Sequence, residues 1–218
     1  GGEPWRLLTA MWLHSGVVHF LFNMVGLRNL GFSLELEFGM LRIGILYMVA
    51  GVAGTLASAV FLPEIVMVGA SGAVMGLFGA CFADFVVNFD NVKRPCCTAF
   101  QLLLSFGITF AIGLTPFVDN FAHVGGFVSG FCSGLFLVIH YRSYTTGVLR
   151  SRVWAKCVGI VAWAALTVLM LAMVASLFTN VDAFGCQCAR CFLHCDTWHS
   201  LGKIHGARQV PTVSSEWQ

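Results

Sequence analysis

Charged residues are scarce in this sequence. Lys, Arg, Asp and Glu make up 10% of its 218 residues, whereas hydrophobic residues make up 58%. Soluble globular domains carry about 25% charged residues, so this chain has too few charges to cover a water-exposed surface. The formal net charge of only +2 gives no basis for nucleic-acid binding. The composition therefore predicts a polytopic membrane protein whose main partner is the lipid bilayer.

The N-terminal residues also lack the pattern of a signal peptide. They read Gly1-Gly2-Glu3-Pro4, with no initiator Met and no basic start followed by an apolar core and a small-residue cleavage site. We interpret the sequence as a fragment that begins inside a loop of a longer protein.

Six apolar segments approach the length of about 20 residues that a helix needs to cross the hydrocarbon core. They are residues 9–30, 43–62, 71–89, 98–114, 120–140 and 156–178. Residues 180–218 form a polar tail without such a segment. We therefore predict an all-α, polytopic transmembrane helix bundle with six spans, organised as a core (1–145), an additional C-terminal helix (146–179) and the tail (180–218).

Basic residues occupy every second joint between these segments, whereas the joints at 63–70 and 115–119 contain none. Basic joints face the cytosol. This orientation places the N-terminal segment, the two uncharged joints and the tail on the non-cytosolic side. The basic residues are Arg28, Arg42, Lys93, Arg94, Arg142, Arg150, Arg152 and Lys156.

Polar side chains in the predicted spans gather near the non-cytosolic end. His14, His19 and Asn23 lie in the first span, Ser71 opens the third, and His123 lies about one turn into the fifth. Polar groups are costly inside a membrane and therefore mark functional sites. A channel or transporter would require polar residues through the full membrane depth, which this distribution disfavours.

Ser71 and His123 suit nucleophilic catalysis. A serine hydroxyl is a weak nucleophile until a neighbouring base accepts its proton, and His123 is the candidate base. This chemistry requires no metal and no cofactor. We therefore predict hydrolysis of a peptide bond, with water reaching Ser71 from the non-cytosolic side.

Acyl transfer also needs hydrogen-bond donors for the developing oxyanion. His19 and Asn23 are four residues apart and share one helical face, so both can donate to one point. The backbone N–H groups around Ser71 add further donors. Gly69 and Gly72 allow a sharp chain entry and close approach of a substrate backbone.

Each of these residues also has a purely structural interpretation. Ser71 could be a small packing residue, His123 a contact between helices, and Asn23 a hydrogen-bonding link in the bundle. His14 could lie in the interface with lipid headgroups. We interpret Asp119 as a solvated interfacial charge and not as a third catalytic member.

Two further patterns concern glycine and cysteine. Small residues three or four apart allow helices to approach closely in lipid, which predicts tight packing along Gly72, Gly76 and Gly79 and along Gly126, Gly130 and Gly134. In the tail, Cys186, Cys188, Cys191 and Cys195 predict two disulfides, while zinc binding with His194, His199 and His205 is the alternative.

Three motifs occur in a fixed order. They are Trp5-Arg6 followed by His14-Ser-Gly-Val-Val-His19-Phe-Leu-Phe-Asn23, then Gly69-Ala-Ser71-Gly72, and then Ala122-His123-Val-Gly-Gly126-Phe-Val-Ser-Gly130. Over residues 5–140 they resemble the signature of rhomboid intramembrane serine proteases. The resemblance implies a Ser71–His123 dyad without an Asp, and an oxyanion site at His19, Asn23 and the Ser71 amide. It also implies cleavage of single-span transmembrane proteins near the membrane surface.

The resemblance is strongest to secretase-like eukaryotic rhomboids, especially those of plants. It implies that the family's first core helix is absent here and that an extra C-terminal helix is present. It favours a Golgi, endomembrane or plasma-membrane location, with a plastid as the alternative.

The chain departs from the family pattern at two positions. Glu35-Leu36-Glu37 stands where many members have Glu-x-Arg, and Met75 stands where many have an aromatic ring on the catalytic histidine. The alternative function is therefore a catalytically inactive relative that binds membrane proteins or directs their trafficking. Structural roles are assigned to Trp5, Arg6, His14, Glu35, Met75, Gly126 and Gly130.

Overall fold

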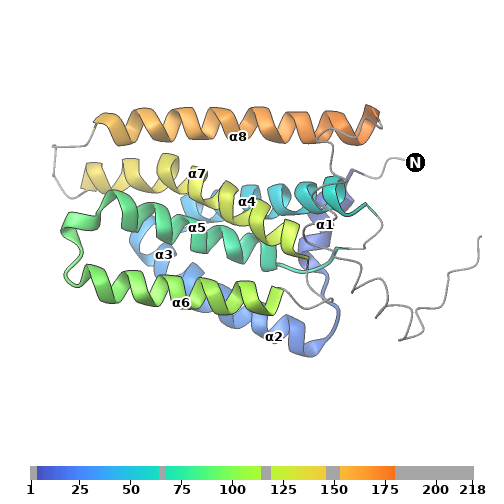
Figure 1. Ribbon diagram of the computed structural model, residues 1–218, viewed down its shortest axis with the longest axis horizontal. Coiled ribbons are helices and arrows are strands. Elements are labelled where there is room, and N and C mark those ends of the chain that lie inside the picture. The colour runs from blue at the N-terminus through green and yellow to red at the C-terminus, as the bar shows by residue number, and fades with distance from the viewer. Residues whose placement is uncertain (1–3, 64–66, 114–118, 146–152, 180–218) are drawn as a thin grey trace, which may run out of the picture. The chain divides into compact units, whose positions relative to one another are not determined.

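A computed structural model describes residues 4–63, 67–113, 119–145 and 153–179 (Figure 1). Every regular element in this part of the chain is helical, so the predicted all-α architecture is confirmed. The tail, with its predicted disulfide or zinc site, lies outside the described residues. The elements are α1 (Arg6–Thr9), η1 (Ala10–Trp12), α2 (Val17–Gly26), η2 (Leu27–Gly31), α3 (Phe32–Phe38), α4 (Met40–Phe61), α5 (Ser71–Val87), η3 (Phe89–Asn91), α6 (Pro95–Gly113), α7 (Asn120–Thr145) and α8 (Val153–Thr179).

Four helical segments in the described part are long and apolar enough to cross a membrane: Val17–Phe38, Met40–Phe61, Asn120–Val138 and Trp154–Leu177. The first of them joins α2, a π-helical turn (η2) and α3. The other two predicted spans correspond to shorter apolar helices, Ser71–Val87 and Pro95–Phe110. The 17 residues of α5 measure about 26 Å, less than the hydrocarbon core of about 30 Å.

The first span begins later than the sequence predicts. Residues 9–12 belong to α1 and η1, and the spanning helix starts at Val17, after Gly16 with φ 142°. The chain turns at Gly16 and is therefore not one continuous helix from residue 9, and the preceding segment is anchored on α4. Met11 is buried against Gly51 of α4, and Thr55 of α4 donates a 2.7 Å hydrogen bond to the Leu7 carbonyl.

Helix α5 packs mainly against α7 and α4. Small residues make this possible, because a Cβ on Gly126 or Gly130 of α7 would collide with the backbone of Gly72 or Gly76 of α5. On the α4 side, a Cβ on Gly76 would collide with Ala50. The backbones of α5 and α7 therefore touch along several turns, and the N-terminal ends of both helices are held together.

The helix ends fall into two groups (Figure 1). At one end, the backbone of Ala122 in α7 lies against Gly54 of α4 and Gly72 of α5. At the other, Ala83 and Val87 of α5 form a buried cluster with the C-terminal part of α7 and the start of α8. The N-terminal ends of α5 and α7 and the C-terminal part of α4 therefore lie at the same end of the bundle.

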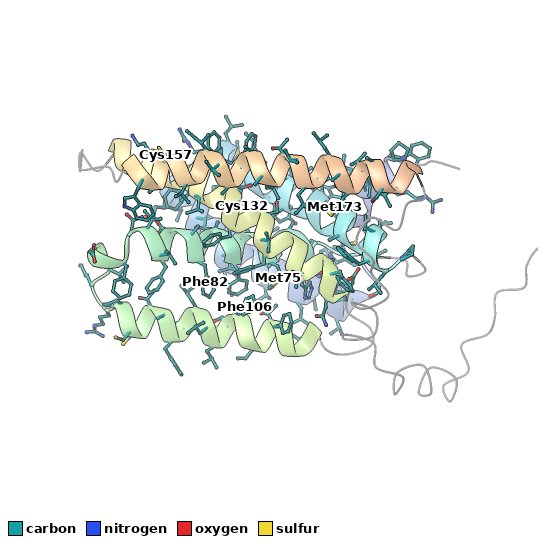
Figure 2. All side chains as sticks on the ribbon, turned by 45° about the horizontal axis from the view of Figure 1, so that its top comes forward. Met75, Phe82, Phe106, Cys132, Cys157 and Met173 are labelled. Carbon is teal, nitrogen blue, oxygen red and sulfur yellow. The ribbon has the colours of Figure 1, made fainter. Side chains whose placement is uncertain are left out.

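Helices α6 and α8 lie against the core through aromatic contacts. Phe106 of α6 contacts Phe82 of α5 and Phe127 of α7, with ring centroids 6.0 Å and 4.9 Å away, and Figure 2 shows Phe106 directed toward Phe82. On α8, Trp163 stacks on Phe136 of α7 at 5.0 Å.

Candidate active site

Ser71 is the first residue of α5 and is half-buried. The chain reaches it through Gly69, whose φ of 125° lies in the region that favours glycine. The Gly69 N–H donates a 3.0 Å hydrogen bond to the Ala10 carbonyl, and the Ala70 carbonyl accepts the first bond of the helix from Val74. The loop before Ser71 is thus fixed at both ends, and the N–H groups of the first helical turn are not used within the helix.

His19 of α2 lies directly against this loop. A Cβ built on Gly69 would lie 2.7 Å from His19 Cε1 and 2.9 Å from Nε2, so only glycine fits here. Asn23 is one turn further along α2, with Nδ2 3.9 Å from the same point. The structure therefore brings His19 and Asn23 of α2 against Gly69, which is two residues before Ser71 in the chain.

The hydrogen bonds of His19 determine which of its nitrogens carries the proton. The Ser15 hydroxyl lies 2.9 Å from Nδ1, and the Ser15 backbone N–H donates to the same atom at 3.4 Å. A backbone N–H can only donate, so Nδ1 is an acceptor and the neutral ring carries its proton on Nε2. The N–H of His19 is therefore the atom beside Gly69.

Asn23 is buried, with 5% of its surface exposed. Its Nδ2 donates a 3.0 Å hydrogen bond to the His19 carbonyl one turn back. An amide group has two N–H donors, so this bond fixes the side chain and leaves the second N–H for another acceptor. His19 and Asn23 together provide two oriented donors on one helical face.

Asp119 directly precedes α7, and its environment differs from the prediction. Its Oδ1 accepts hydrogen bonds from the Phe121 and Ala122 N–H groups at 2.9 Å and 3.1 Å, as an N-cap residue does, and its Oδ2 is buried. The interpretation as a solvated charge is therefore wrong. Asp119 fixes the first turn of α7, and its carbonyl accepts the His123 N–H at 3.3 Å.

His123 is almost fully buried, with 3% of its surface exposed. Its neighbour Ala122 contacts Gly72, and Gly126 one turn later contacts the same glycine, so the turns bearing Ser71 and His123 touch through their backbones. His123 also lies within electrostatic range of His19 and Asp119.

No hydrogen bond joins Ser71 to His123 within the described part of the chain, because both ring nitrogens of His123 lack a partner there. A buried polar group without a partner costs about 1–3 kcal/mol, and such groups are typical of functional sites. Catalytic hydrogen bonds are often long before substrate binds and shorten in the complex.

The other predicted residues surround this cluster or lie apart from it. His14 lies in the loop before α2, not in a span, with its ring 5.4 Å from that of His19. Met75 is buried one turn after Ser71. Trp5 and Arg6 are exposed at the start of α1, and Glu35 is exposed on α3.

Sequence reasoning overlooked Ser15, which selects the proton position of His19. Ser15 lies outside α2, which begins at Val17, so helical spacing does not predict its contact with His19. Gly54 of α4 also serves the site, because it allows the backbone of Ala122 to approach.

Gly69→Ala tests whether the contact with His19 matters. The added methyl group displaces the His19 ring, and we expect kcat for the proposed reaction to fall about 10²-fold, as on loss of one oxyanion donor. Gly39→Ala is the matched control, since Gly39 also has a positive φ of 89° but its Cβ would meet only Arg42 at 3.8 Å. Equal losses of kcat in the two variants would show that backbone strain alone explains the effect.

These features define a class of protein: a membrane-embedded helix bundle with a serine, two histidines and an asparagine gathered at one end. The Rhomboid domain family model matches residues 1–140. The chain therefore belongs to the rhomboid family, and the resemblance noted in its motifs is confirmed.

Curated relatives agree with this assignment. RHOMBOID-like protein 6, mitochondrial, of Arabidopsis thaliana is 45% identical over 143 residues, covering 66% of this chain and 47% of that protein. RHOMBOID-like protein 4 of the same plant is 46% identical over 143 residues, covering 65% and 36%. Inactive RHOMBOID-like protein 8 is 37% identical over 127 residues, covering 58% and 36%. The chain spans less than half the length of these relatives.

Proposed function

We propose that this protein is an intramembrane serine endopeptidase that cleaves single-span transmembrane proteins. The observation that carries the proposal is the gathering of Ser71, Gly69, His19 and the turn of α7 that bears His123. Ser71 supplies the nucleophile and His123 accepts its proton and later donates it to the leaving amine. No metal ion takes part in this scheme.

The oxyanion of the tetrahedral intermediate would be bound by donors from two helices. His19 contributes its Nε2–H group and Asn23 its second amide N–H. The N–H groups at the start of α5, at Ser71 and Gly72, carry the positive end of the helix dipole. Donors that are already oriented need no rearrangement during the reaction, which is why such sites lower the barrier.

We propose that the site opens to the non-cytosolic side. Helix α5 is shorter than the hydrocarbon core is thick, so Ser71 would lie below the membrane surface and water would have to enter from that side. A Golgi, endomembrane or plasma-membrane location fits this orientation. One relative is named as mitochondrial, so fractionation of cells expressing the protein has to distinguish these compartments.

The alternative is a rhomboid-like protein that binds membrane proteins without cleaving them. The missing hydrogen bond to His123 and the match to a relative named inactive favour it. A reporter consisting of one tagged transmembrane segment separates the two functions. Cleavage by the full chain supports the protease, whereas capture of the intact reporter without cleavage supports the alternative.

His123→Ala gives the first test of the dyad. Without a base, the Ser71 hydroxyl remains protonated, and we expect cleavage of the reporter to fall at least about 10³-fold. Labelling by a fluorophosphonate probe, which reacts with activated serines, should be lost as well. Because both readouts are normalised to protein in the membrane fraction, reduced expression does not imitate the effect. Persistent labelling at Ser71 in the variant would exclude His123 as the base.

A further inference from the structure

The cysteines of the described chain fall into two groups. Cys81 of α5 and Cys132 of α7 are partly buried, whereas Cys96, Cys97 and Cys157 are exposed, and all five are free thiols. The three exposed thiols lie near the starts of α6 and α8, both on the side that the basic joints assign to the cytosol. Figure 2 shows Cys157 near that end of α8.

Cys96 and Cys97 are adjacent and lie at the membrane boundary. They are the second and third residues of α6, which begins at Pro95 directly after the exposed Lys93 and Arg94. Basic residues at this position interact with anionic headgroups of the cytosolic leaflet, so the two thiols lie at headgroup level. Cys157 is the fifth residue of α8 and therefore lies about one turn further from its helix start.

The cysteine pair also begins an apolar stripe on the outer face of α6. Phe106 faces the bundle through its contacts with Phe82 and Phe127. Cys97 precedes Phe106 by nine residues, or about two and a half turns, and so lies on the opposite face of the helix.

This outer face continues with three apolar side chains along α6. Phe100, Leu104 and Ile108 are 65%, 50% and 54% exposed. From Cys97 to Ile108 the helix rises about 16 Å, close to the depth of one leaflet, which is half of about 30 Å. The apolar stripe is thus long enough to lie beside an extended hydrocarbon chain that is attached at the cysteine pair.

We propose that Cys96 and Cys97 are sites of S-acylation by long-chain fatty acids. The cysteine sulfur attacks the thioester carbonyl of a fatty acyl-CoA under the action of a membrane acyltransferase. The bond between the carbonyl carbon and the CoA sulfur breaks, a new thioester forms on the cysteine, and the thiol proton leaves with CoA. The acyl chain then lies in the cytosolic leaflet beside α6. Juxtamembrane cysteines are typical acceptors, and the modification is reversible.

The test uses the full chain expressed in eukaryotic cells fed an alkyne-tagged palmitate. We expect label on the parent that hydroxylamine removes, because hydroxylamine cleaves thioesters. In the double variant C96S/C97S the label per protein in the membrane fraction should fall to background. C157S is the matched control with an exposed thiol, and it should keep its label. Mass spectrometry of the parent should find the acyl group on the peptide that contains Cys96 and Cys97.

Several results would overturn the proposal. These are an unlabelled parent, label that persists in C96S/C97S, or acyl groups that map only to Cys157 or to the tail cysteines. Since the mass-spectrometric assignment uses the parent alone, it decides the matter even where the double variant folds poorly. The outcome does not depend on Ser71 or His123, so a protein without protease activity could still carry the modification.

Discussion

Ser71→Ala is expected to abolish cleavage of a transmembrane reporter, with a loss of at least about 10³-fold. The substitution removes only the hydroxyl oxygen, so the tight contact between Gly72 of α5 and Ala122 of α7 should remain. The variant should therefore be as abundant in the membrane as the parent and still bind the reporter. Cleavage is measured by the appearance of the tagged fragment over time.

Ser133→Ala is the matched control for this experiment. Ser133 is fully buried in α7, and its hydroxyl lacks a hydrogen-bond partner among the described residues. Removing an unsatisfied group is neutral or slightly stabilising, so cleavage should stay at the level of the parent. Undiminished cleavage by Ser71→Ala would remove the basis of the proposed mechanism, since no other nucleophile is assigned to the site.

Gly130→Ala is expected to lower the free energy of unfolding more than any other substitution proposed for this protein. A Cβ at Gly130 would collide with the carbonyl oxygen and Cα of Gly76. These are backbone atoms that cannot rotate away, so α5 and α7 would have to separate. Overpacking of a core commonly costs about 1–3 kcal/mol, and we expect the upper end of that range or more. Thermal unfolding in detergent measures the effect, and cleavage should fall in parallel because the two helices carry Ser71 and His123.

Gly107→Ala in α6 provides the control for glycine replacement in a membrane helix. No heavy atom lies within 4 Å of a Cβ built on Gly107. Replacing glycine by alanine in an open helical position should be neutral or should stabilise the helix by up to about 1 kcal/mol. Similar destabilisation of both variants would mean that the contact between α5 and α7 does not limit stability.

The sequence was sufficient to predict the bundle because lipid imposes a simple rule: a spanning helix needs an apolar surface. For this reason the predicted segments 43–62 and 71–89 agree closely with α4 and α5. The same rule failed at residues 9–16. Hydrophobicity does not distinguish burial in lipid from burial in protein, and Met11 is buried against Gly51 of α4.

The candidate site was only partly predictable for a related reason. The position of Ser71 at the start of a helix follows from the glycines around it, and the shared face of His19 and Asn23 follows from their spacing. The hydrogen bond from Ser15 to His19 and the cap at Asp119 depend on backbone conformation at the helix starts. The proton position of His19 therefore follows from the folded structure and not from the sequence.

The hydrogen bond from Gly69 to the Ala10 carbonyl makes the geometry around Ser71, the proposed nucleophile, depend on a segment outside the spans. Thr55 holds the same segment at Leu7, so the short helices α1 and η1 act as a brace between α4 and the loop before Ser71. If the proposed cleavage is correct, a substitution in the brace would alter its rate without touching any of the proposed reacting groups. Effects of this kind on activity are better interpreted as changes in alignment than as evidence for further reacting side chains.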